Sequence, residues 1–239
     1  MSLRSFVTVV ASLRPRLGKT FLARMLCDFH LHDGRNVAAF DLNADDSALS
    51  QFMPGHSAPA DVTNINGQMA LFDRLIADDG AHKVVDLGHE AFKDFFKVAH
   101  DIGFAAEARQ RGAAMVVLFI ASDDAAASEA YAALRRDFPQ AIIVPVHNEF
   151  LGSAQHRDKF PSTGSGSAMV HLPALAPGLR RITERKPFSF VDTRGGSPDI
   201  ALETHIELQR WLRRVFLEFR ELELRVLLSD LQSSIQVQS

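Results

Sequence analysis

The chain has 239 residues, 46% of them hydrophobic and 23% charged, and its net charge at pH 7 is -3. This composition is ordinary for a soluble globular protein, and the charge excludes a uniformly basic nucleic-acid-binding surface. A single cysteine, Cys27, excludes an internal disulfide framework and is expected to fill the core of a protein in a reducing compartment. The longest apolar run, 113–121, is half as long as a membrane span, and 6–11 is too short for a signal-peptide core. We therefore expect a cytoplasmic protein with no integral membrane segment.

Strands and helices are predicted to alternate along the chain. Apolar runs typical of buried strands occupy 5–12, 36–42, 82–87, 114–121, 141–146 and 169–172. Helical spacing of apolar residues, with helix-favouring composition, occupies 20–32, 68–77, 91–111 and 125–137. Strands that are apolar throughout and separated by helices are typical of a parallel sheet covered on both faces. The sequence therefore predicts a doubly wound, mainly parallel α/β sheet of about seven strands, with ligands binding at the carboxyl ends of the strands.

A long C-terminal helix is predicted over 199–231, after loops at 151–167 and 194–198. We expect one domain over 1–239, with residues 1–196 as its core. Apolar residues at alternating spacings of four and three give this helix a seam. The seam consists of Leu208, Leu212, Val215, Phe219, Leu222 and Val226, and Trp211, Phe216, Leu224 and Leu227 widen it. Three interpretations stay open: packing on the helix's own domain, contact with a second subunit or a protein partner, and an amphipathic membrane anchor.

The first candidate motif lies between the first predicted strand and the first predicted helix. A phosphate-binding loop needs inward-facing backbone N–H groups, a helix N-terminus and a lysine that reaches the outer phosphates. The segment 13–20 reads LRPRLGKT and ends in Gly18-Lys19-Thr20, as the pattern G-x-x-x-x-G-K-[ST] requires, although Leu13 replaces the first glycine. Lys19 is predicted to bind the β- and γ-phosphates, and the Thr20 hydroxyl to bind Mg²⁺. The alternative is an ordinary turn between a strand and a helix.

The loop resembles that of the ParA/MinD family of deviant-Walker P-loop ATPases, which reads K-G-G-x-G-K-[ST]. Arg14 lies at the position of the signature lysine, which in that family reaches the phosphates of the partner across a nucleotide-sandwiched dimer. Arginine offers a bidentate geometry toward phosphate. Pro15 and Arg16 replace two family glycines; proline removes an N–H donor, and arginine takes a positive φ less readily than glycine.

Two further motifs resemble the family at the ends of later strands. Asp41 matches the first aspartate of the family motif D-x-D-P-Q, and Asn43 replaces the second, which positions the attacking water. An amide orients water but cannot accept its proton, so hydrolysis is expected to be slow or absent. Asp45 is either a substitute carboxylate or part of the acidic first turn of a helix. Asp86 ends a run that resembles the Walker B strand and would hold Mg²⁺, with a turn aspartate as the alternative.

The resemblance also implies contacts with the adenine base. Asn148 and Pro173 match the family positions that line the base pocket, and the implied nucleotide contacts are Leu17, Gly18, Lys19, Thr20, Phe21, Asn148 and Pro173. The implied catalytic residues are Arg14, Asp41 and Asn43, and the implied metal ligands are Thr20, Asp41 and Asp86. The cofactors would be ATP or ADP with Mg²⁺.

The family's activity would make this chain an ATP-dependent dimer switch with weak or regulated hydrolysis. Such proteins position plasmids, chromosomes, or division and secretion machinery, so a homodimer and a protein partner of such a system are expected. Two alternatives stay open: a non-catalytic interaction protein on a degenerate P-loop scaffold, and a small-molecule kinase. Non-specific DNA binding has weak support from the basic residues at 180, 181, 185 and 186, which a solvated face also explains. No metal cluster is expected around His30 and His32, because carboxylate and cysteine partners are missing at ligand spacing.

Overall fold

The computed structural model describes residues 5–44, 46–152, 160, 169–191 and 200–236, and the side chains only up to residue 232. Seven strands form one sheet in the order β3-β2-β4-β1-β5-β6-β7, and every neighbouring pair is parallel. The strands are β1 (Ser5–Ala11), β2 (Val37–Leu42), β3 (Ser57–Pro59), β4 (His82–Leu87), β5 (Ala113–Ile120), β6 (Ile142–Asn148) and β7 (Val170–Leu172). The predicted fold class, a doubly wound parallel α/β sheet with a long C-terminal helix, is confirmed.

Helices cover both faces of the sheet because alternate residues of each strand point to opposite sides. The helices are α1 (Lys19–His32), α2 (Ala48–Phe52), α3 (Ile65–Ile76), α4 (Phe92–Asp101), α5 (Phe104–Gln110), α6 (Ala125–Asp137), α7 (Pro177–Thr183) and α8 (Leu202–Gln236), with a short 3₁₀ turn η1 (Glu149–Leu151). On one face, strand residues such as Val10 pack with α1, α2, α7 and α8. On the other, residues such as Val9 pack with α3 to α6. The sheet therefore separates two apolar cores.

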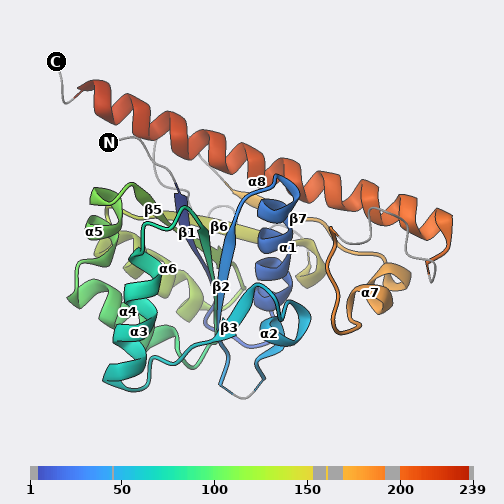
Figure 1. Ribbon diagram of the computed structural model, residues 1–239, viewed down its shortest axis with the longest axis horizontal. Helices are drawn as coiled ribbons and strands as arrows, with labels where there is room; N and C mark the ends of the chain where they lie inside the picture. The colour runs from blue at the N-terminus through green and yellow to red at the C-terminus, as the bar shows by residue number, and fades with distance from the viewer. Residues whose placement is uncertain (1–4, 45, 153–159, 161–168, 192–199, 237–239) are drawn as a thin grey trace.

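Helix α8 runs along one side of the molecule, across α1 (Figure 1). Its predicted seam, from Leu208 to Val226, is buried in the same core as α1 and the sheet. Of the three interpretations of this helix, packing on its own domain is the one that the structure supports for the seam. Trp211 and Phe216 are also buried, whereas Leu224 is exposed. Among the described residues, no helix is both long enough and apolar enough to cross a bilayer.

The structure differs from the sequence prediction in several short elements. The single helix expected over 91–111 is broken into α4 and α5 at Gly103, whose φ of +62° ends the helical path. Sequence patterns missed α2, α7 and the three-residue strand β3, which are too short for a periodic signal. The predicted loop 194–198, most of the loop 151–167, the candidate carboxylate Asp45 and the predicted helix start Asp199 lie outside the described residues.

Candidate functional site

The carboxyl ends of β1, β2 and β4 bring the predicted phosphate loop and carboxylates to one edge of the sheet. In the parallel register, Asp41 lies opposite Asp86, and Asp86 lies opposite Val10 of β1. The loop 12–18 follows β1 directly and leads into the N-terminus of α1. Sheet order changes direction at β1, and in open α/β sheets ligands bind at such a switch point, outside the carboxyl ends of the strands.

Two residues of the loop, Arg16 and Gly18, have a left-handed backbone conformation. Gly18 has a φ of +95°, and a Cβ placed there would lie 3.0 Å from the side-chain nitrogen of Asn148, so glycine suits this position. Arg16, which replaces a family glycine, has a φ of +60°. The left-handed conformation costs a non-glycine residue about 1 kcal/mol. The loop therefore keeps a turn at Arg16 that glycine would make at lower cost.

Lys19 is held inside the loop by its own chain. Its ammonium group donates hydrogen bonds to the Ser12 hydroxyl at 3.1 Å and to the Arg14 carbonyl at 3.0 Å. Only 6% of the residue is exposed, and this burial lowers the pKa of Lys19. Ser12 was not among the predicted site residues; its signal in the sequence is a hydroxyl at the end of the first predicted strand. The arrangement holds a cation at the loop, in the place where outer phosphates are expected to bind.

The two predicted carboxylates lie side by side and share one donor. The Asn43 amide donates to Asp41 Oδ1 at 2.8 Å and to Asp86 Oδ2 at 3.0 Å. Asp41 also accepts a hydrogen bond from the backbone N–H of Ser50 at 3.1 Å. Burial raises the pKa of Asp86 to about 7; a hydrogen bond from Thr20 opposes this shift, and the nearby Asp41 adds to it. The predicted ligands Thr20, Asp41 and Asp86 therefore do meet, with Asn43 between the carboxylates.

A hard divalent cation fits this set of donors. Mg²⁺ prefers hydroxyl and carboxylate oxygens, and Asp86 Oδ1 is buried without a hydrogen-bond partner among the described residues. An unsatisfied carboxylate oxygen is costly in the interior, and a cation or its bound water would satisfy it. The Thr20 hydroxyl and the two carboxylates would hold the ion, which would neutralise phosphate charge.

Replacing Asn43 with aspartate tests this arrangement directly. The change removes the side-chain donor bonds to Asp41 and Asp86 and places a third carboxylate beside two buried ones. We expect Asn43→Asp to destabilise the protein by about 3 kcal/mol without metal, because like charges repel and donors are lost. Mg²⁺ should restore much of this stability. Urea unfolding with and without Mg²⁺ measures both effects, and equal destabilisation in the two conditions would argue against a cation at this site.

Arg14 is exposed and pairs within its own chain. Its Nε donates to Asp124 Oδ2 at 3.3 Å, and Asp124 also caps α6 by accepting from the Ala127 N–H at 2.9 Å. The predicted role of Arg14, a bridge to phosphate across a dimer, stays a prediction. Reaching a second subunit would require Arg14 to leave Asp124, and ion pairs this exposed are weak.

The predicted base contacts are engaged by neighbouring parts of the chain. Asn148 donates to the Leu17 carbonyl at 3.0 Å and accepts from the Phe150 N–H at 3.1 Å. The Pro173 carbonyl accepts a hydrogen bond from the Trp211 indole at 3.0 Å. The Phe21 ring packs on Trp211, with centroids 5.7 Å apart. Asn148 thus connects β6 to the loop 13–20, whereas Phe21 and Pro173 contact α8.

Comparisons with known proteins do not show a family for this chain. No protein-family model matches the chain, and no curated protein matches it. Among solved structures, a nucleotide-binding protein from Archaeoglobus fulgidus, in complex with ADP and containing cobalt, is 12% identical. The match covers 89% of this chain and 88% of that one, with a TM-score of 0.39. At a TM-score this low, nothing about the ligand of that protein transfers to this chain.

Proposed function

We propose that this protein binds ATP or ADP with Mg²⁺ at the loop 13–20. The observation that carries the proposal is the buried Lys19 ammonium beside the N-terminus of α1, on the same sheet edge as Asp41 and Asp86. A cation, a helix N-terminus and paired carboxylates together suit a polyphosphate with its metal ion. The helix would bind phosphate oxygens, Lys19 would contact the outer phosphates, and the carboxylates would hold Mg²⁺ with Thr20.

Hydrolysis is proposed to be slow. Asn43 replaces the carboxylate expected to position water, and its amide donates to Asp41 and Asp86. An amide cannot take a proton from the attacking water. By resemblance to ParA/MinD proteins, nucleotide state would control dimerisation, and the dimer would serve a positioning or secretion system. Arg14 would then exchange Asp124 for a phosphate of the partner.

A non-catalytic interaction protein on the same scaffold is the second candidate. The Asn43 bridge and the Arg14–Asp124 pair favour it, because both groups have partners within the chain without any nucleotide. Titration calorimetry with ATP and Mg²⁺ distinguishes the two candidates. Micromolar or tighter binding with slow turnover supports the first, and no binding by a folded protein at millimolar nucleotide supports the second. Sedimentation with and without nucleotide then tests the dimer.

Restoring the family glycines is expected to strengthen nucleotide binding. The double variant Pro15→Gly, Arg16→Gly regains one N–H donor and removes the strained φ at position 16. A hydrogen bond to a charged phosphate is worth about 1.5–3 kcal/mol, so we expect about tenfold tighter ATP binding after the entropic cost of two glycines. Pro54→Gly, in an exposed turn, is the matched control and should leave ATP affinity unchanged. An unchanged or weaker affinity in the double variant would contradict backbone recognition of phosphate here.

A further inference from the structure

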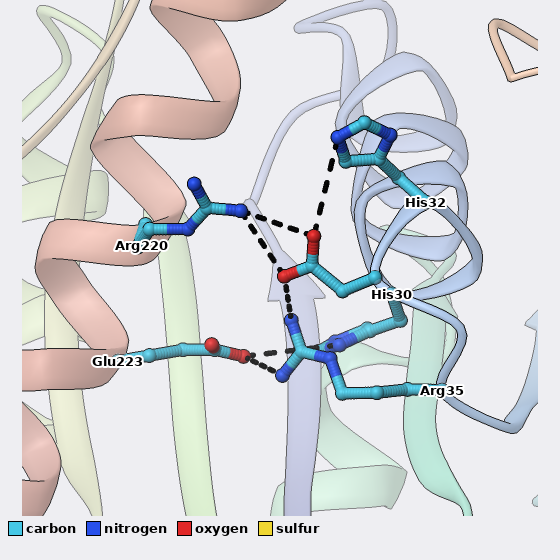
Figure 2. A network of polar contacts seen from close by, with 6 residues as sticks. His30, His32, Arg35, Arg220 and Glu223 are labelled. Carbon is cyan, nitrogen blue, oxygen red and sulfur yellow. Dashed lines mark hydrogen bonds and ion pairs between the residues drawn. The ribbon is translucent and has the colours of Figure 1, made fainter.

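Three metal-ligating side chains meet far from the phosphate loop, at the other end of α1. His30 comes from α1, His82 from the start of β4 and Glu223 from α8, and their donor atoms all lie within 4.8 Å of one another. His30 Nδ1 is 3.8 Å from Glu223 Oε1. Figure 2 shows Glu223 extending from α8 toward Arg35 and His30. No metal cluster was predicted around His30 and His32, because carboxylate and cysteine partners are missing at ligand spacing; His82 and Glu223 are distant in the chain and meet His30 only in the fold.

The two imidazoles are buried without hydrogen bonds at one ring nitrogen each. His30 is 2% exposed and His82 is 6% exposed. Nδ1 of both rings has no hydrogen-bond partner among the described residues. An imidazole binds a metal ion through a ring nitrogen that carries no proton, and a nitrogen without a hydrogen bond is available for this.

We propose that His30, His82 and Glu223 form a binding site for a divalent transition-metal ion, with Zn²⁺ as the best match. Two imidazole nitrogens and one carboxylate are a ligand set that Zn²⁺ uses, with a water in the fourth position. Glu223 is partly exposed, so the fourth position would face solvent on that side. The ion would connect α1, β4 and α8, and would fix α8 to the sheet.

Binding requires two local rearrangements. The rings of His30 and His82 are stacked, with centroids 4.2 Å apart and planes 15° apart, so the lone pairs of their nitrogens lie in nearly parallel planes. One ring must turn for both nitrogens to reach the same ion. Glu223 must also loosen its contact with Arg35, whose Nη1 donates to Oε1 at 2.8 Å. Arg35 is thus a competing cation at the site, and its positive charge is expected to weaken metal binding.

The test is a titration of the full chain with Zn²⁺ by calorimetry and with Co²⁺ by visible absorption. Excess Mg²⁺ is present throughout to fill the oxygen-ligand site at Asp41 and Asp86. Nucleotide is left out, so the result does not depend on the proposed function. We expect one ion per chain, a Co²⁺ spectrum typical of imidazole ligation, and a higher melting temperature with Zn²⁺.

Variants identify the ligands. His82→Gln and Glu223→Gln should each weaken Zn²⁺ binding at least about 100-fold, because each removes one of three protein ligands. Glu223→Gln keeps an acceptor for Arg35, so it is the variant least prone to misfolding, and circular dichroism checks the fold of both. His32→Gln is the matched control: His32 lies on the same helix and pairs with Asp33 instead, so Zn²⁺ affinity should not change.

Replacing Arg35 distinguishes a metal site from an ion-pair network that binds no metal. Arg35→Gln removes the competing cation, and a metal site should then bind Zn²⁺ about tenfold more tightly. A network without metal function would lose stability in this variant and bind no Zn²⁺. The proposal is overturned if the unaltered protein binds no Zn²⁺ at millimolar concentration, or if binding survives both His82→Gln and Glu223→Gln.

Discussion

Lys19→Ala is expected to weaken ATP binding at least 100-fold. The change removes the ammonium group that the loop holds through Ser12 and the Arg14 carbonyl. With it go the charge-assisted bonds that we propose Lys19 makes to the outer phosphates. Each such bond contributes about 1.5–3 kcal/mol, and two of them account for the expected loss. Calorimetric titration with ATP and Mg²⁺ measures the effect.

Lys97→Ala is the matched control for Lys19→Ala. Lys97 is exposed on α4 and pairs with Asp101 at 2.6 Å, so its removal changes the net charge equally without touching the loop. ATP affinity should stay within a factor of two of the original in this control. If Lys19→Ala binds ATP as tightly as Lys97→Ala does, the loop is not a phosphate site and the non-catalytic candidate gains support.

Phe219→Ala is expected to destabilise the protein by about 3–5 kcal/mol, the usual cost of removing a buried phenylalanine ring. Phe219 lies in the seam of α8, is 1% exposed and packs edge-on against Phe29 of α1 with centroids 5.6 Å apart. The cavity would open where α8 meets the sheet-covering helix α1. Urea unfolding monitored by circular dichroism measures the change in the free energy of unfolding.

Leu217→Ala provides the control on the same helix, two residues away. Leu217 is 62% exposed, so its truncation should change stability by no more than about 0.5 kcal/mol. Equal effects of Phe219→Ala and Leu217→Ala would mean that α8 does not pack on the domain through its predicted seam. The contrast also tests whether α8 is an integral layer of the domain rather than an appendage.

The packing of α8 bears on the candidate site as well. Trp211 of α8 contacts Phe21, one residue after Thr20, and donates to the carbonyl of Pro173 after β7. The first turn of α1 therefore packs against the C-terminal helix α8. Trp211 thus connects the C-terminal helix to the helix that follows the loop 13–20.

Sequence patterns were sufficient where the determining interactions are local. The apolar strands, the helix after Gly18-Lys19-Thr20, the helix 125–137 and the seam of the last helix were all predicted from periodicity and composition. The meeting of Asp41 and Asp86 was also predictable, because both end parallel strands and such ends share one edge of the sheet. Burial of the seam required the structure, since periodicity identifies an apolar face but not the surface that covers it.

Only the tertiary structure decided which side chains meet across long stretches of chain. Arg14 pairs with Asp124, Asn43 bridges two strand ends, and His30 meets His82 and Glu223 because strand order and helix crossing bring them together. No spacing in the sequence encodes such meetings, since each depends on register and packing of several elements at once. The sequence by itself thus determined a doubly wound parallel α/β fold with a long apolar-faced helix, and the tertiary structure decided how its polar groups are paired.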